Sequence, residues 1–259
     1  MNFSLEGRTY VIMGVANKRS IAWGIARSMH AAGARLIFTY ASERFEKSVR
    51  DLADTLEGGH ESLFYECDVT EDEAIIQTFE KIQEDVGVIH GLAHCIAYAN
   101  RDELKDEFLN TSREGFLTAH NISSYSLTAV ARAAKPLMTE GGSIVTLTYL
   151  GGEQVVQNYN VMGVAKASLD ASMKYLANDL GKHNIRVNAI SAGPIRTLSA
   201  KGVGDFNQIL SVIEERAPLR RPVTQEEVGD TAYYLMSDLS RGVTGEVIHV
   251  DSGFNIVSY

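Results

Sequence analysis

Short apolar runs alternate with amphipathic stretches along most of the chain. The apolar runs predict strands at Thr9–Met13, Arg35–Tyr40, Leu63–Asp68, Gly91–Ala97, Gly142–Thr148, Arg186–Ser191 and Glu246–Val250. The stretches between them predict helices near Ile21–Ala32, Glu43–Leu56, Glu71–Val86, Ser112–Leu137, Asn158–Leu180 and Thr224–Leu239. This alternation is typical of an α/β fold: a doubly wound, seven-stranded parallel sheet with helices on both faces.

Domain organisation follows from what interrupts this pattern. The chain has no internal repeat, low-complexity tract or Pro/Gly/Ser linker, so we expect one domain over residues 1–259. Asn100–Thr111 and Ile195–Phe206 follow strands but show weak periodicity. Loops that leave the carboxyl ends of strands build ligand sites in such sheets. We therefore expect substrate loops near residues 97–111 and 195–206, the second closing over the substrate.

Composition excludes several classes of protein. The 259 residues carry a formal net charge of −9, which argues against a nucleic-acid binder. The N-terminus lacks the apolar region of a signal peptide, and no apolar run approaches the roughly 20 residues needed to span a bilayer. Cys67 and Cys95 fit free thiols in a reducing compartment. We expect a cytoplasmic protein with no metal site and no membrane insertion.

The turn after the first strand runs from Gly14 to Gly24 without the central glycine of a G-x-G-x-x-G motif. Gly14 suits a tight turn, and Gly24 suits close helix–strand packing. Ser20 is placed to cap the next helix, whose N-terminus would hold a pyrophosphate. A plain strand–helix connection explains the segment equally well.

Cofactor choice is weakly encoded at the second strand. The strand is followed by Ala41-Ser42-Glu43-Arg44, with no acidic residue at its end to take a ribose hydroxyl. Arg44 therefore keeps NADPH open beside NADH. Asp68 suits the adenine amino group, although a turn role is the alternative. The small residues around Ile96 would let the fourth strand approach the cofactor closely.

Tyr159 and Lys166 form the strongest chemical pair in the chain. They are seven positions apart, nearly two helical turns, and therefore share a helix face, about 10 Å apart along the axis. Both side chains can reach one ligand between them. A nearby ammonium would stabilise the phenolate and bind ribose hydroxyls. Alternatively, the pair is a surface lysine and a half-buried tyrosine. Tyr149 follows the fifth predicted strand and is therefore expected at the same carboxyl edge of the sheet, although a packing role would also explain a tyrosine there.

These residues together resemble the short-chain dehydrogenase/reductases, and more closely their bacterial enoyl-[acyl-carrier-protein] reductases of the NADH type, over the whole chain. The Y-x₆-K spacing and the tyrosine at position 149 distinguish this group from ketoreductases, which use Y-x₃-K and a serine. The matching motifs are Gly14–Gly24, Cys67–Val69, Ala119–Tyr125, Thr148–Gly152, Asn158–Gly163 and Arg186–Leu198.

The resemblance implies a Rossmann fold and assigns the site residues. Cofactor contacts would come from Gly14, Ser20, Ile21, Asp68, Val69, Ile96, Lys166, Ile195, Arg196, Thr197, Leu198 and Ser199. The catalytic residues would be Tyr149, Tyr159 and Lys166, and Ala99, Met162 and the two tyrosines would bind substrate. The resemblance also implies an acyl-carrier-protein partner, a homotetramer and inhibition by triclosan-like phenols.

The expected reaction is hydride transfer from NADH to the β-carbon of a trans-2-enoyl thioester. The alternatives are a carbonyl-reducing enzyme of the same superfamily and a catalytically silent dinucleotide sensor. The basic residues Arg196, Lys201, Arg220 and Arg221 are a candidate landing site for an acidic carrier protein, or else a solvated charged rim.

Overall fold

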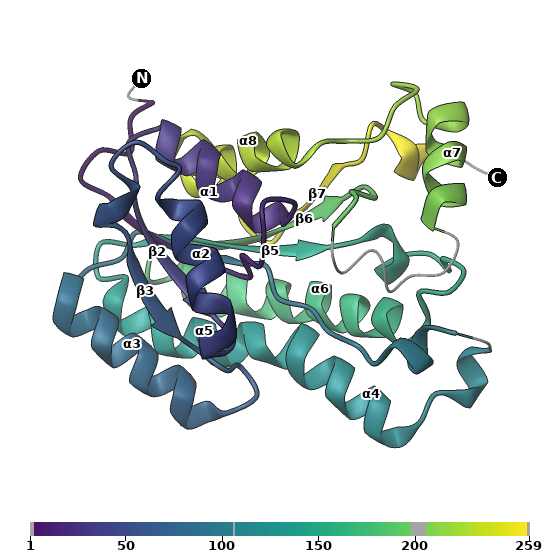
Figure 1. Cartoon of the computed structure of the whole chain (residues 1–259), viewed down its shortest axis with the longest axis horizontal. Helices are drawn as coiled ribbons and strands as arrows, with labels where there is room; N and C mark the ends of the chain where they lie inside the picture. Colours follow the sequence, from purple (N-terminus) through teal and green to yellow (C-terminus); the bar gives the residue numbers. More distant parts are fainter. Residues whose placement is uncertain (1–2, 106, 198–205, 258–259) are drawn as a thin grey trace.

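Seven parallel strands form one sheet in the computed structural model, which describes residues 3–105, 107–197 and 206–257 (Figure 1). The strands are β1 (Thr9–Met13), β2 (Arg35–Tyr40), β3 (Leu63–Glu66), β4 (Gly91–His94), β5 (Gly142–Thr148), β6 (Ile185–Ala192) and β7 (Val247–Val250). Their order is β3-β2-β1-β4-β5-β6-β7. The order reverses between β1 and β4, so the carboxyl ends of these two strands flank the crevice where such sheets bind ligands.

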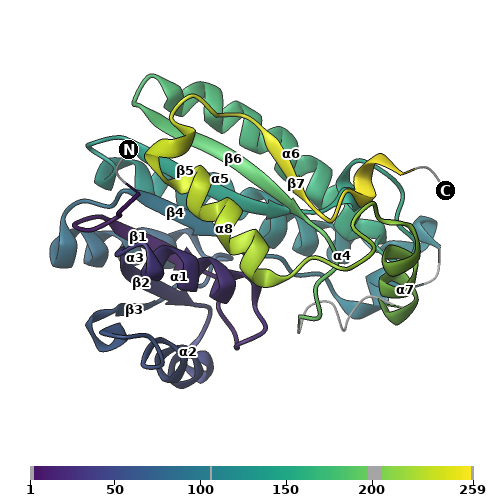
Figure 2. The same cartoon turned by 90° about the horizontal axis from the view of Figure 1, so that it is seen from above.

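Helices cover both faces of the sheet (Figures 1 and 2). One face carries α1 (Ile21–Ala31), α2 (Glu46–Ala53) and α8 (Gln225–Met236), and the other carries α3 (Asp72–Val86), α5 (Ser126–Ala134) and α6 (Asn160–Gly181). Strand β1 shows why both faces are apolar: Val11 and Met13 join one buried cluster, whereas Tyr10 and Ile12 join the other. The predicted doubly wound fold is confirmed.

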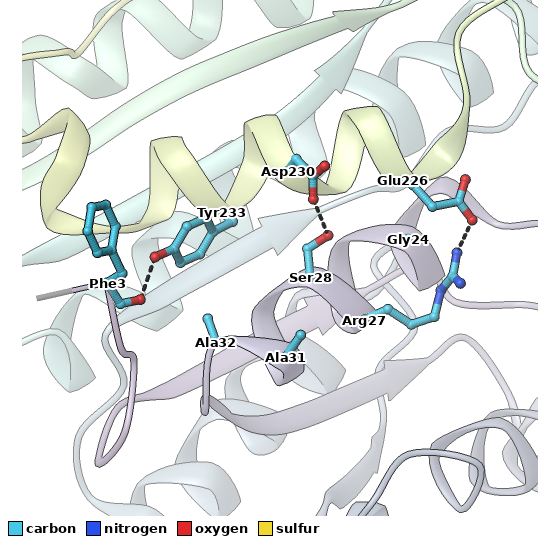
Figure 3. A pocket seen from close by; sticks show the side chains of 9 residues that line it. All are labelled: Phe3, Gly24, Arg27, Ser28, Ala31, Ala32, Glu226, Asp230 and Tyr233. Carbon is cyan, nitrogen blue, oxygen red and sulfur yellow. Dashed lines mark hydrogen bonds and ion pairs between the residues drawn. The ribbon is translucent and has the colours of Figure 1, made fainter.

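The contact between α1 and α8 depends on glycine. A Cβ at Gly24 would overlap the backbone oxygen of Gln225, and one at Gly229 would overlap that of Gly24. Gly24 therefore serves helix–helix packing, and the expectation that it packs against a strand was wrong. Figure 3 shows the Arg27–Glu226 ion pair and the Ser28–Asp230 hydrogen bond between the two helices, beside a pocket of about 470 Å³.

The predicted helix Ser112–Leu137 is interrupted. It divides into α4 (Arg113–His120), a π-helical turn (Asn121–Tyr125), α5 and a 3₁₀ turn (Lys135–Leu137). The Ser123 hydroxyl accepts a hydrogen bond from the backbone N–H of Tyr98 (2.9 Å) and donates to its carbonyl (3.1 Å). The wider turn thus ties α4 to the loop after β4, and π turns of this kind are frequent at functional sites.

Other boundaries also differ. β3 and β4 end earlier than expected, since β1 pairs with β4 only as far as Met13↔His94. α7 (Phe206–Arg216) was not predicted, and its Ile213 packs with Leu150 and Phe254 beyond the strand ends (Figure 1). The remaining short elements are 3₁₀ turns at Glu43–Phe45, Gly59–Glu61, Arg101–Leu104, Phe108–Asn110, Leu150–Gly152, Asp238–Ser240 and Phe254–Ile256.

Membrane-spanning helices and metal-binding clusters are both absent from the described residues. None of their helices combines the length and apolar character that a membrane crossing requires. They also contain no cluster of three or more His, Cys, Asp or Glu side chains arranged to hold a metal ion. Cys67 and Cys95 are free thiols, the first buried and the second partly buried.

Candidate active site

The turn after β1 is shaped by close approach to β4. Gly14 has φ +91°, and a Cβ there would overlap the carbonyl oxygen of Cys95. Only glycine fits such a position without strain. The turn therefore brings Gly14 beside Cys95. This is the switch point of the sheet. The expected approach of the cofactor to Ile96, which is partly buried, stays a prediction.

Ser20 stands at the N-cap position of α1 but does not cap the helix with its side chain. Its Oγ instead accepts hydrogen bonds from the backbone N–H groups of Ala16 (3.0 Å) and Asn17 (3.1 Å). The expectation of a side-chain cap was therefore wrong. Ser20 folds the preceding loop, and the first-turn N–H groups of α1 beginning at Ile21 carry the positive end of the helix dipole.

Asp68 takes part in a local turn. Its Oδ1 accepts hydrogen bonds from the backbone N–H (2.9 Å) and the hydroxyl (2.8 Å) of Thr70. This is the turn role that was the alternative at this position, and the adenine contact stays a prediction. Val69 is buried under the same turn.

Tyr159 lies at the strained start of α6. The helix begins at Asn160, two residues later than predicted, and Tyr159 is its N-cap residue. Asn158 and Asn160 on either side have φ of +62° and +35°. Two non-glycine residues at positive φ cost free energy that the surroundings must offset, and such strain clusters at functional sites.

Two apolar clusters meet at the tyrosine pair. Tyr149 packs against the cluster of Leu150, Ile213, Ala217 and Phe254. Tyr159 and Ala99 pack against the cluster of Leu104, Ala119, Val161, Met162 and Ala165. The two phenol rings touch edge to face, with centroids 4.9 Å apart at 73°. The four predicted substrate residues thus adjoin one another around this contact.

Lys166 is buried deeply for a lysine, with 5% of its surface exposed. Its Nζ donates a 2.6 Å hydrogen bond to the backbone oxygen of Leu147 on β5. Burial lowers the pKa of the ammonium to about 8, although Asp170 and Cys95 oppose the shift. Lys166 is therefore anchored to the sheet.

Burial also controls the Tyr159 phenol. Desolvation raises its pKa well above the ordinary value for tyrosine, and the neighbouring Tyr149 and Asp170 raise it further. Stabilisation of a developing Tyr159 phenolate by the Lys166 ammonium stays a prediction. Tyr159 remains protonated at neutral pH and is a hydrogen-bond donor.

The segment after β6 is described only in part. Ile195 packs against the cluster under α1 and α8, and the guanidinium of Arg196 bonds Asn207 Oδ1 on α7 (2.8 Å). Thr197 donates its backbone N–H to Ile195 O. Leu198 and Ser199, with the rest of the predicted covering loop up to residue 205, lie outside the described residues, as does Lys201.

The basic residues proposed as a landing site have local partners. Arg221 forms a 2.6 Å ion pair with Glu227, the residue that completes the capping box of α8. Arg220 donates to the backbone oxygen of Glu215. Both remain exposed, so the structure is compatible with a charged rim as well as with a carrier contact.

Sequence reasoning missed two buried polar groups beside Lys166. Asp170 is 9% exposed and Thr148 is 4% exposed. Among the side chains that the structure describes, Asp170 Oδ1 and Thr148 Oγ1 are buried without a hydrogen-bond partner. Their positions in the sequence could have revealed them, because Asp170 follows Lys166 by one helical turn and Thr148 is the last residue of β5.

The residues present fit a dinucleotide. Gly14 lets the turn after β1 pass close to Cys95 at the switch point, and α1 begins at Ile21 after this turn. The buried Lys166 ammonium has three N–H donors, one of which bonds the Leu147 carbonyl. Such a combination suits pyrophosphate at one end and ribose hydroxyls at the other.

A family model described as Enoyl-(Acyl carrier protein) reductase matches residues 14–255. The chain belongs to the enoyl-(acyl carrier protein) reductase family. A Bacillus cereus relative named "Enoyl-[acyl-carrier-protein] reductase [NADH] FabI" is 75% identical over 253 residues, which cover 98% of each chain. A Staphylococcus aureus relative, named as the NADPH form of FabI, is 64% identical and is aligned over 98% of this chain and 99% of its own.

A solved structure extends the likeness to the fold of this enoyl reductase. The Bacillus cereus enoyl-acyl carrier protein reductase, crystallised with NADP⁺ and an indole naphthyridinone, matches with a TM-score of 0.97 and 73% identity over 100% of both chains. The predictions of family, fold and oxidoreductase class are confirmed.

Proposed function

We propose that this enoyl reductase transfers a hydride from NADH to the β-carbon of a trans-2-enoyl thioester carried by acyl-carrier protein. The α-carbon then takes up a proton, which gives the saturated thioester and NAD⁺. This proposal rests on the edge-to-face contact of Tyr149 and Tyr159 after the carboxyl end of β5, together with the Lys166 ammonium that bonds the β5 residue Leu147. NADPH is the second donor to test, because the names of close relatives include both forms.

The dinucleotide supplies the hydride when it is bound. We assign its binding to Gly14, Ser20, Ile21, Asp68, Val69, Ile96, Lys166, Ile195, Arg196, Thr197, Leu198 and Ser199. These residues differ in what they can bind. Backbone N–H groups at the start of α1 suit a phosphate, whereas the Lys166 ammonium, with three donors, suits ribose hydroxyls.

Tyr159 would act on the substrate as a neutral donor. Negative charge develops on the thioester oxygen as the β-carbon is reduced, and a hydroxyl already directed at that oxygen stabilises it. The raised pKa of Tyr159 keeps the proton on the phenol until then. One preorganised donor of this kind contributes roughly 10²–10³ in rate. Tyr149 would hold the Tyr159 ring in place and line the same mouth.

The acyl chain would lie on the apolar wall. Ala99 and Met162 belong to the cluster that supports Tyr159, and both offer carbon surface with no charge. We assign residues 97–111 and 195–206 as the loops that enclose the chain. Burial of apolar surface would give affinity that grows with chain length, at about 0.8 kcal/mol per methylene.

Carbonyl reduction and silent dinucleotide binding are the competing functions. An absorbance assay at the reduced-nicotinamide band separates all three, with crotonyl and acetoacetyl thioesters and each cofactor in turn. We expect oxidation of NADH with the crotonyl thioester. Turnover with only the acetoacetyl thioester would establish a ketoreductase, and binding without turnover would establish a sensor.

We propose acyl-carrier protein as partner and a homotetramer as the assembly, working in the cytoplasm. The side of the molecule formed by α4 and α6 exposes several large apolar residues, which a subunit contact would cover: Phe116, Leu117, Tyr125, Val164 and Tyr175. Sedimentation at a single-chain mass would refute the tetramer.

A KM for carrier-bound substrate that is insensitive to salt would refute a landing site at Arg196, Lys201, Arg220 and Arg221. Triclosan-like phenols would compete at the tyrosine pair.

A further inference from the structure

Asp170 is a buried acid that the proposed reaction does not use. It lies on α6 one turn beyond Lys166, and 9% of its surface is exposed. Its Oδ1 is buried and has no hydrogen-bond partner among the described residues. An unsatisfied buried oxygen destabilises the folded state, so its presence calls for an explanation.

The geometry directs Asp170 towards Lys166. Helical side chains lean towards the N-terminus, so residue i+4 lies over residue i on the same face. The turn Leu150–Gly152 closes over this face: a Cβ at Gly152 would lie 3.1 Å from Asp170 Oδ2 and 3.0 Å from the backbone nitrogen of Ala167. The carboxylate is thus enclosed between α6 and the turn that follows Tyr149.

The ammonium needs such a neighbour. Lys166 donates its hydrogen bond to the neutral carbonyl of Leu147, which compensates little for burial of a full charge. Of the groups that favour its charged form, Asp170 has the largest effect, and Cys95, just after β4, has the next largest. Burial raises the pKa of Asp170, whereas the nearby Thr148 hydroxyl and, after it, Lys166 lower it, so each charge of the pair supports the other.

The other groups around the pair act from neighbouring elements. At the end of β4, burial lowers the pKa of His94 to about 3, and in the next residue it raises the pKa of Cys95 to about 12. Glu153 in the turn and Lys174 on α6 act on Asp170, with opposite signs. Glu153 also bonds the ring of His249 on β7 (2.9 Å). Tyr149 and Tyr159 complete the surroundings, and burial raises the pKa of Tyr159, which keeps that phenol protonated in the neutral range.

We propose that Asp170 is a positioning residue that keeps Lys166 in its ammonium form, so that the lysine holds the nicotinamide ribose over the whole working pH range. The proposal rests on the ribose role assigned to Lys166. Without the acid, burial would release the lysine proton at lower pH. Affinity for the dinucleotide would then fall earlier as the pH rises, and would be normal at a pH low enough to keep the lysine charged.

The first test is the Kd of NADH, followed by fluorescence from pH 6 to pH 10, for wild type and Asp170→Asn. For wild type we expect affinity to fall as the pH rises through about 8. For Asp170→Asn we expect the fall about one pH unit or more lower, with Kd values that agree with wild type to within about twofold at pH 6. Asp170→Glu, which restores the charge, should restore the wild-type profile.

Two variants serve as controls. Asp179→Asn removes an exposed acid from the same helix, and His249→Gln removes the histidine that bonds Glu153. Neither should move the midpoint. If Asp170→Asn weakens binding equally at every pH, or leaves the midpoint unchanged, Asp170 has only a structural role and the proposal is wrong.

A second measurement separates this proposal from the assignment of Lys166 to the ribose. The Lys166 side-chain resonance, identified by its loss in Lys166→Arg, is titrated by NMR in the protein without dinucleotide. We expect a lower Lys166 pKa in Asp170→Asn than in wild type. An equal pKa in both would overturn the proposal. A lowered pKa with an NADH Kd that does not depend on pH would overturn the ribose role alone.

Discussion

Two strand–turn–helix units of this protein meet at one site by different means. The β1–α1 unit is built from backbone: Gly14 closes against Cys95, and Ser20 uses its hydroxyl to fold the loop rather than to contact the helix. The β5–α6 unit is built from side chains, with a tyrosine at each end of the turn and Lys166 buried behind them.

The two units differ in which residues hold unfavourable conformations or buried charge. In the first unit, one backbone position, Gly14, has a conformation that requires glycine. In the second unit, Asn158 and Asn160 have positive φ, and burial lowers the pKa of Lys166. Thr148 Oγ1 and Asp170 Oδ1 are buried there without a hydrogen-bond partner among the described residues. Backbone N–H groups are sufficient to bind a phosphate. Control of protonation and charge requires titratable side chains that are shielded from water. Substitutions in the second unit should therefore change chemistry, and those in the first should change folding or binding.

Removal of the Tyr159 hydroxyl should have the largest effect. We expect Tyr159→Phe to lower kcat by roughly 10²–10³ while KM changes little, because the lost hydrogen bond strengthens only as charge develops. Steady-state kinetics with a crotonyl thioester measure both constants. Tyr175→Phe, at a tyrosine that is 77% exposed on the same helix, is the matched control. Wild-type turnover in Tyr159→Phe would remove this residue from the mechanism.

Loss of the buried ammonium should come next. Lys166→Ala should raise the Kd of NADH by roughly 10–100-fold, because hydrogen bonds from a charged group contribute about 1.5–3 kcal/mol. Fluorescence titration measures this directly, with Lys182→Ala, at an exposed lysine at the C-terminal end of α6, as the control. A Kd equal to that of wild type, together with a reduced kcat, would move Lys166 from binding to chemistry.

A Cβ in the backbone-built unit should affect folding. Gly14→Ala should lower the free energy of unfolding by about 1–3 kcal/mol, because it combines positive φ with a clash against Cys95. Gly7→Ala is the control, since Gly7 also has positive φ (+77°) but has open space around its Cβ position. Denaturant unfolding gives both values. Equal losses would mean that the close approach to β4 contributes nothing.

The smallest effect is expected at Tyr149. Tyr149→Phe keeps the ring that packs edge to face on Tyr159, so we expect less than a tenfold loss of kcat. Tyr149→Ala should cost more, because it removes the ring as well. A loss in Tyr149→Phe as large as that in Tyr159→Phe would make the two hydroxyls equal partners and would contradict this division of roles.

The sequence predicted the sheet better than the site. The limits of β1, β2 and β5 agree with the structure to the residue, because apolar runs with sharp edges define buried parallel strands. α7 was missed although Ile209, Ile213 and Ala217 recur at helical spacing, because the preceding segment is irregular. The π turn at Asn121–Tyr125 depends on a tertiary bond between Ser123 and Tyr98, which no local pattern encodes.

The chemistry of the site was only partly predictable. Spacing placed Tyr159 and Lys166 on one helix, but burial decides their protonation, and burial comes from the turn Leu150–Gly152 and the clusters around it. The protonation state of Tyr159 therefore does not follow from the spacing alone. The hydroxyl of Ser20 also has partners in its own loop, which its position before a helix does not reveal.

The most direct test is a crystal structure of the ternary complex with oxidised dinucleotide and an enoyl thioester. We predict that the Tyr159 hydroxyl lies within about 2.5–3.0 Å of the thioester oxygen, while Lys166 Nζ reaches the nicotinamide ribose hydroxyls. A complex in which the Tyr159 hydroxyl and Lys166 Nζ both point away from the bound molecules would contradict the account.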